Sequence, residues 1–457
     1  MGSAAASGQW DAAEFLKVPL RECAARVAGL TGDAELADIF HRGLRDTLET
    51  TLSREPDGTT FVITGDIPAM WLRDSSAQML PFLRFLGPEG GADAEELYQV
   101  LAGLSRRQFG CIAQDSYANA FNQTASGAAW DPADACEDPW IWERKYEVDS
   151  LAFPIWLAHA VWRRTGRADV FDGMVRGVLQ AIVSQLRLEQ DHENSSPYTF
   201  VRQTELPTEM LARDGRGPAA GRTGMTWAGF RPSDDACTYS YNIPGNLFAA
   251  QALRQLAEIA AEVYGDAELA SDAVGLAREI SDGVASFGVV LHPAHGDMYA
   301  YEVDGLGNTL LMDDANMPSL LSLPLTGGIA ADDPLYMATR AYILGPENPH
   351  YYEGTRAAGI GSPHTPPGYI WPIALAVQGL TTPDRAEKLR LLRLLRDTTG
   401  GTGMMHEGFD PSAPENFTRP WFSWANSMFA ELVLDYCGIG ALPDESRGGH
   451  FAPRVEP

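Results

Sequence analysis

The stretch AELADIFHRGLRDTLET, residues 34–50, repeats apolar side chains at the spacing of an α-helix. Leu36, Ile39, Phe40 and Leu44 recur every three to four residues, so they share one face of a helix and leave the charged residues on the other. The same period predicts further helices at 13–29, 75–86, 94–108, 149–165, 169–188, 245–264, 267–286, 334–344, 371–380, 383–398 and 422–437. Strand patterns are limited to hairpin-like pieces at 60–64 and 297–314. About twelve helices without strand–helix alternation favour an all-α (α/α)6 toroid over a parallel α/β sheet.

The composition predicts a soluble protein that binds neither nucleic acid nor membrane. A formal net charge of −27 opposes contact with phosphate backbones and anionic lipids. The chain has no run of the ~18 apolar residues that span a bilayer, and no secretory signal is visible. Its 5 cysteines are scattered without a CxxC pair, which indicates free thiols and a cytoplasmic location. The oligomeric state stays open.

The connections between helices carry most of the polar and aromatic residues. Those at 110–148, 189–244, 287–317, 345–370 and 399–421 are much longer than ordinary loops. They are rich in Trp, Tyr, Asp and Glu, which is not the composition of a disordered chain. We expect one domain over residues 11–440 with these loops gathered at one mouth, a flexible arm at 1–10 and a tail at 441–457.

Besides the segment at 229–246, five loops place carboxylates, amides and aromatic rings just before helix starts. The segment GFRPSDDACTYSYNIPGN at 229–246 holds Asp234 and Asp235 beside Arg231. The other candidates are Arg73 and Asp74, Glu147 and Asp149, Asp314 and Asn316, His364 and Trp371, and His406, Glu407, Trp424 and Asn426. One such loop is explained by helix capping, for which Asp74 is a suitable residue. Five together favour a shared pocket for a polyhydroxylated ligand, with aromatic faces for its sugar rings.

Other chemistries find little support in the sequence. There is no GxxxxGK[ST], complete GxGxxG, GxSxG or HExxH motif, so we expect no nucleotide cofactor and no zinc-protease site. Paired aspartates leave a calcium or magnesium site as an alternative, but no EF-hand spacing occurs. We therefore expect neither cofactor nor metal.

Six motifs in one order resemble glycoside hydrolase family 125, the exo-α-1,6-mannosidases with an (α/α)6 fold. They are MWLRDSSAQ, KYEVDSLAFPIWL, FRPSDDACTYSYNIPGN, DDANMPSLLSLP, IGSPHTPPGYIWPI and MHEGFDPSAPENFTRPWFSWANSMF, and the resemblance covers roughly residues 10–440. The resemblance implies inverting, metal-independent removal of a non-reducing-end α-1,6-linked mannose from an oligosaccharide. It implies a general acid at Asp234 or Asp235, a general base at Glu407, and sugar contacts from Arg73 and Asp74.

The chemistry of inversion fits two separated carboxyl groups, one that protonates the leaving oxygen and one that activates water. Adjacent residues point in different directions, so only one member of the aspartate doublet faces the glycosidic oxygen. We favour Asp234 as the acid and expect Asp235 to bind backbone or Arg231, with the reverse assignment as the alternative. Two other functions stay open: hydrolysis of another α-linkage on the same toroid, and an inactive mannose-binding protein.

Overall fold

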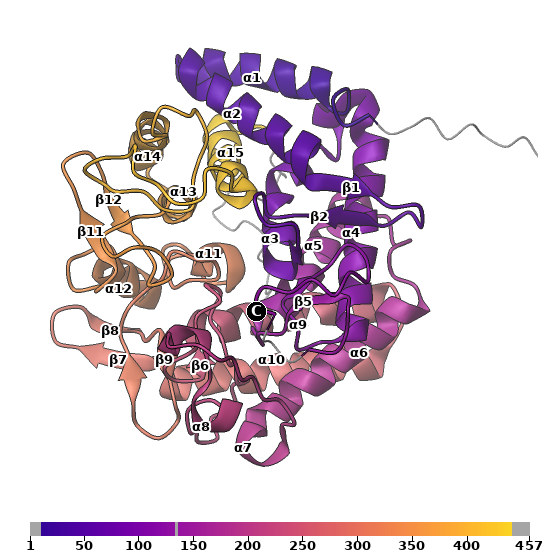
Figure 1. Cartoon of the computed structure of the whole chain (residues 1–457), viewed down its shortest axis with the longest axis vertical. Helices are drawn as coiled ribbons and strands as arrows, with labels where there is room; N and C mark the ends of the chain where they lie inside the picture. The colour runs from indigo at the N-terminus through magenta and orange to yellow at the C-terminus, as the bar shows by residue number, and fades with distance from the viewer. Residues whose placement is uncertain (1–10, 133–135, 441–457) are drawn as a thin grey trace, which may run out of the picture.

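Helices in two concentric layers surround the centre of the molecule (Figure 1). The computed structural model describes residues 11–132 and 136–440, so the predicted arm at 1–10 and tail at 441–457 lie outside the described residues. The inner layer is made of α3 (Leu72–Gln78), α5 (Asp149–Thr165), α9 (Ile243–Glu262), α11 (Leu323–Thr326), α13 (Pro372–Leu380) and α15 (Ser423–Cys437). The inner ring closes because α15, its last helix, packs against α3, its first. This is the (α/α)6 fold that the helical period predicts.

The inner helices are buried on nearly all sides, whereas the outer ones have one buried face. Every residue of α3 is buried, as are most of α9 and α15. The outer layer is made of α2 (Ala34–Asp46), α4 (Ala94–Gln114), α6 (Gly173–Leu188), α10 (Ala267–Phe287), α12 (Pro334–Ile343) and α14 (Arg385–Asp397). Burial on all sides explains why α9, α13 and α15 have largely apolar sequences, whereas the outer helices have a single apolar stripe.

The helix inventory differs from the predicted one at several places; the predicted helix at 75–86, for example, is α3 followed by a 3₁₀ helix at Leu80–Phe85. The inner helix α11 has only 4 residues, LPLT, which is too short to show a helical period. The predicted helix at 13–29 exists as α1 (Lys17–Thr31), but it packs outside the ring against α2 and α15. Two further short helices, α7 (His192–Ser195) and α8 (Ala212–Gly215), lie in the long 189–244 connection.

Short antiparallel strands organise the loops. One sheet joins β3 (Met70–Trp71), β4 (Ala120–Phe121) and β5 (Ile141–Glu143), and a second joins β6 (Tyr241–Asn242), β9 (Glu302–Val303) and β10 (Thr309–Leu310). The remaining strands form three hairpins: β1 (Leu52–Arg54) with β2 (Thr60–Val62), β7 (Val289–His292) with β8 (Gly296–Tyr299), and β11 (Tyr351–Glu353) with β12 (Ala358–Ile360). The first sheet matters most for function, because it aligns the loop ends that precede α3 and α5.

All five cysteines are free thiols, as predicted: Cys23, Cys111, Cys136, Cys237 and Cys437. Burial raises the pKa of the Cys111 thiol to about 12, so this group stays protonated. Among the described residues, no helix has the length and apolar character needed to cross a membrane.

Candidate active site

A cavity of about 240 Å³ opens among the loops that precede the inner helices. Its walls include eight residues singled out from the sequence: Arg73, Asp74, Asp234, Asn316, His364, Trp371, Glu407 and Trp424. The volume lies below the ~300–1,000 Å³ of pockets that enclose drug-sized ligands. The cavity therefore suits a small ligand, such as one sugar ring, with carboxylates and aromatic faces around it.

Aromatic side chains form the buried part of the cavity. Trp371 lies at the start of α13 and donates its Nε1–H to Thr365 Oγ1 at 2.9 Å. Trp424 lies in the first turn of α15, and the guanidinium of Arg73 stands 5.8 Å from the centre of its ring. Phe422 packs edge-on against both tryptophans. These contacts fix the ring faces, which can then pack against the apolar face of a sugar.

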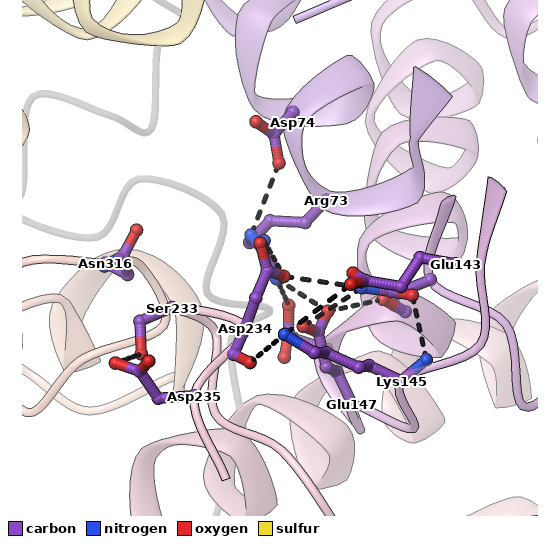
Figure 2. A network of polar contacts seen from close by, with 12 residues as sticks. Arg73, Asp74, Glu143, Lys145, Glu147, Ser233, Asp234, Asp235 and Asn316 are labelled. Atoms are coloured by element: carbon purple, nitrogen blue, oxygen red, sulfur yellow. Dashed lines mark hydrogen bonds and ion pairs between the residues drawn. The ribbon is translucent and has the colours of Figure 1, made fainter. Parts of the chain in front are cut away.

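Arg73 is the centre of a buried ionic network (Figure 2). Its Nη1 lies 2.7 Å from Glu147 and 3.3 Å from Asp149, and its Nη2 lies 3.0 Å from Asp234. Its Nε is 3.4 Å from Asp74, the third residue of α3. The capping role considered for Asp74 is wrong, because Trp71 is the N-cap and α3 has no side-chain cap. Four carboxyl groups thus surround one guanidinium.

The network holds protons because its carboxyl groups are buried and, second, because they outnumber its cations. Burial raises the pKa of Asp74 and of Asp149 to about 6, although Arg73 opposes both shifts. Burial also raises the pKa of Glu147 well above its usual value, and the neighbouring Asp234 adds to this effect. Burial also acts to raise the pKa of Asp234. The charge of Arg73 and the hydrogen bond with Glu147 outweigh burial, so the pKa of Asp234 is lowered. Glu147 is therefore the protonated partner of this pair and Asp234 the ionised one.

The two members of the aspartate doublet occupy different surroundings. Asp234 lines the cavity and turns toward Arg73, whereas Asp235 turns toward Ser233 (Figure 2). Asp235 is buried; it accepts a hydrogen bond from Ser233 Oγ at 3.1 Å and lies 3.5 Å from His364 Nδ1. The predicted partnership with Arg231 is wrong, because the Arg231 guanidinium is paired with Glu302. The difference follows from the sharp turn that separates the two side chains.

The buried side chain of Lys145 holds that turn in place. Asp234 has a left-handed backbone with φ of 66°, which is rare for a residue other than glycine. Lys145 donates to the backbone oxygen of Asp234 at 2.7 Å and to Glu209 at 2.9 Å. Strained backbone of this kind persists where surrounding contacts fix it, commonly at functional sites. Lys145 and its partners thus fix the direction of the Asp234 carboxylate.

A second aspartate pair supports the Asn316 amide. Asp313 accepts hydrogen bonds from the backbone N–H groups of Leu320 and Leu321, at 2.8 and 3.0 Å. Asp314 accepts from the backbone and side-chain nitrogens of Asn316, at 3.0 and 2.9 Å. Asp314 itself does not line the cavity, so it acts on this wall through Asn316.

Glu407 reaches the cavity from the loop that precedes α15. Its Oε1 lies 3.6 Å from Nη1 of Arg419, which also binds Asp66. Burial of His364 works against its charge, but the hydrogen bond with Asp235 and the nearby charges of Glu407 and Asp234 raise its pKa to about 9. A positively charged His364 therefore stands among carboxylates from two separate loops.

Two other predicted residues support the loop and do not line the cavity. His406 bonds with the backbone oxygen of Arg419 at 3.1 Å and stacks on Phe417, with ring centres 3.6 Å apart. Asn426 accepts a hydrogen bond from the backbone of Met405 at 2.9 Å. Both residues hold the chain on either side of Glu407 in place.

Sequence reasoning missed several residues of the cavity wall: Thr64, Ile67, Trp71, Trp130, Glu143, Lys145, Glu209, Ser233, Thr365, Pro366, Thr418, Arg419 and Phe422. For Lys145 a signal existed, since it stands two residues before Glu147 in the motif KYEVD. Glu209 and Trp130 come from loop segments that match no recognised pattern.

Beside the cavity, one group of residues has the donor types of a metal site. Ligand atoms of Glu209, Asp235 and His364 lie within 4.8 Å of one another. The Glu209 carboxylate is already bound by the buried cations Lys145 and Arg202. A divalent ion at this place has to compete with these two cations and with the proton on His364, so the group fits a metal poorly.

Comparisons with known proteins agree with this geometry. The family described as metal-independent alpha-mannosidase (GH125) matches residues 33–434. The meiotically up-regulated gene 157 protein of Schizosaccharomyces pombe is 40% identical over 433 residues, which cover 88% of this chain and 82% of that protein.

Solved structures give the same result. A metal-independent alpha mannosidase of Streptococcus pneumoniae, in a non-productive complex with alpha-1,6-mannobiose, is 46% identical with a TM-score of 0.88. The match covers 93% of this chain and 99% of that one. A glucoamylase from Saccharomycopsis fibuligera is 13% identical with a TM-score of 0.56, covers 96% of this chain and 99% of that chain, and shows the fold alone.

Proposed function

Because this chain belongs to glycoside hydrolase family 125, the metal-independent α-mannosidases, we propose that it removes one α-1,6-linked mannose from the non-reducing end of manno-oligosaccharides or N-glycan fragments, with inversion. The observation that carries this proposal is the placement of Asp234 and Glu407, from separate loops, on the wall of one small cavity. The linkage is supported by the α-1,6-mannobiose bound to the Streptococcus pneumoniae relative. The cavity size supports exo action, since it encloses about one ring.

In the proposed reaction Asp234 is the general acid and Glu407 the general base. The Asp234 carboxyl donates its proton to the glycosidic oxygen as the bond from that oxygen to the anomeric carbon breaks. Water attacks the anomeric carbon from the opposite face, and Glu407 accepts the proton that this water loses. The products are β-mannose and the shortened oligosaccharide. Asp234 is favoured over Asp235 because Asp234 lines the cavity and Asp235 is bound by Ser233 and His364.

The acid needs a proton, and Glu147 is the proposed source. Asn119 Nδ2 lies 3.4 Å from Glu147 and 3.4 Å from Asp234, so the two carboxyl groups share one amide donor as well as Arg73. A sugar hydroxyl that accepts from Arg73 weakens the hold of Arg73 on the Asp234 carboxylate. The pKa of Asp234 then rises toward that of Glu147, and the proton passes to Asp234.

A linkage panel with two variants tests the proposed function. The wild type should release mannose from α-1,6-mannobiose and leave α-1,2-mannobiose, α-1,3-mannobiose and isomaltose intact. Glu407→Gln should lower kcat by about 10²–10⁴-fold, the usual contribution of a general base, while calorimetry still detects mannose binding. Cleavage of another linkage in preference would overturn the substrate assignment. Near-wild-type activity of Glu407→Gln would overturn the assignment of the base.

A further inference from the structure

The cavity has one exposed aromatic wall. Trp371 and Trp424 are each 1% exposed and Trp71 is 5% exposed, whereas Trp130 is 50% exposed. Of the large apolar side chains that are exposed in the described parts of the chain, Trp130 is the one that also lines the cavity. It therefore stands at the opening, where the rest of an oligosaccharide leaves the enclosed ring.

The backbone around Trp130 is fixed. Its N–H donates to the backbone oxygen of Trp142 at 3.0 Å, which joins its loop to β5. The Asn122 amide donates to the backbone oxygens of Ala128 and Pro139, at 2.7 and 3.1 Å, and ties the two ends of the loop together. These bonds anchor the backbone at Trp130, so a ligand that binds there has little backbone to order.

The neighbouring residues extend this wall inward. Ala69, Trp71 and Ala120 form a small apolar cluster apart from the main core, and Ile67 and Trp142 pack against it. Ile67 and Trp71 also line the cavity, so its wall carries further apolar side chains besides Trp130. Packing of the loop does not require a half-exposed indole, because the backbone contacts already hold it. A large aromatic surface beside a sugar cavity is suited to stacking on a pyranose ring.

We propose that Trp130 is a binding platform for a mannose unit on the leaving-group side of the cleaved bond. This inference rests on the proposed function, since it assigns a place to the part of the substrate that remains after the terminal mannose is removed. Stacking on Trp130 lowers KM for oligosaccharides and makes the chain prefer an α-1,6-linked oligosaccharide to a mannoside with a small leaving group. It adds no group to the chemical step.

Substrates with and without a second sugar test the platform. The probes are α-1,6-mannotriose and α-mannosyl fluoride, whose leaving group has no ring to stack. For Trp130→Ala the ratio of kcat/KM for mannotriose to kcat/KM for the fluoride should fall about three- to tenfold. The fall should come from a higher KM for mannotriose and not from a lower kcat. Trp130→Phe should recover most of the ratio. Leu291→Ala, which removes a 79% exposed apolar side chain on β7, is the matched control and should leave the ratio at the wild-type value.

A ratio unchanged within twofold in Trp130→Ala would overturn the inference. Calorimetry separates this outcome from a failure of the proposed function. In the Glu407→Gln background, Trp130→Ala should weaken mannotriose binding by a similar factor. If the wild type cleaves the fluoride but no α-1,6 linkage, the linkage assignment is wrong. The calorimetric titration with mannotriose then decides the role of Trp130, and an affinity unchanged by Trp130→Ala refutes that role.

Discussion

Replacement of Arg73 by methionine should destabilise the protein in a manner that depends on pH. The change removes the guanidinium around which four carboxyl groups lie at 2.7 to 3.4 Å. Loss of one partner from a buried ion pair costs about 3–5 kcal/mol. An unfolding entropy of about 2.1 cal/mol/K per residue over 457 residues gives about 1 kcal/mol/K, so the Tm should fall by about 3–5 °C at pH 8.

The sign of the pH dependence follows from the carboxyl pKa values. Asp74 and Asp149 already have pKa values of about 6 with Arg73 present, and Arg73 lowers both. Without it these values rise further above those of the unfolded chain, so the folded state binds more protons than the unfolded one. Stability is then retained at low pH and lost as the pH rises. The Tm difference from wild type should be larger at pH 8 than at pH 5.

Calorimetric melting at both pH values, with Arg54→Met as the control, measures this effect. Arg54 pairs with Glu96 at 3.1 Å, but both side chains are partly exposed, so the loss should stay below about 1 kcal/mol. The reasoning is refuted if Arg73→Met melts within 1 °C of wild type at pH 8, or if it loses more stability at pH 5 than at pH 8.

Three further predictions concern the chemistry. Glu147→Gln should slow α-1,6-mannobiose hydrolysis by about 10²–10⁴-fold. It should slow α-mannosyl fluoride hydrolysis far less, because fluoride leaves without a proton. Equal slowing of both reactions argues against Glu147 as the proton source. The charge on His364, whose pKa is raised to about 9, is present below that pH and lost above it, so kcat/KM should fall above pH 9 in wild type. A pH–rate profile of His364→Gln that keeps the same alkaline fall assigns it to another group. Dialysis against EDTA should leave the mannobiose rate unchanged, and a rate restored only by added calcium contradicts a metal-independent reaction.

The long helices could be predicted closely from the sequence because their ends carry local signals. The predicted helix at 149–165 has the bounds of α5, which ends at Gly166 in a left-handed conformation with φ of 69°. The inner helix α11 could not be predicted, since four residues carry no period and the turn before it is held by the buried Asp313. The local sequence pattern therefore predicts the helices themselves. Whether a helix belongs to the inner or the outer layer depends on contacts with segments that are distant in the sequence.

The candidate site was predictable where several polar residues share a motif. Arg73, Asp234 and Glu407 stand in such motifs, and all three line the cavity. The support of the Asp234 turn was not predictable, because Lys145 reaches the backbone of a residue 89 positions away. The position of Trp130 at the opening likewise depends on the fold of its loop.

The most direct test of the proposed reaction is the anomeric form of the first product. Proton NMR during wild-type hydrolysis of α-1,6-mannobiose, before mutarotation, separates the two anomers of the released mannose. Asp234 as acid and Glu407 as base predict that β-mannose appears first and that the α anomer grows in later. Initial release of α-mannose contradicts this account, since it requires a covalent intermediate and two carboxyl groups in different roles.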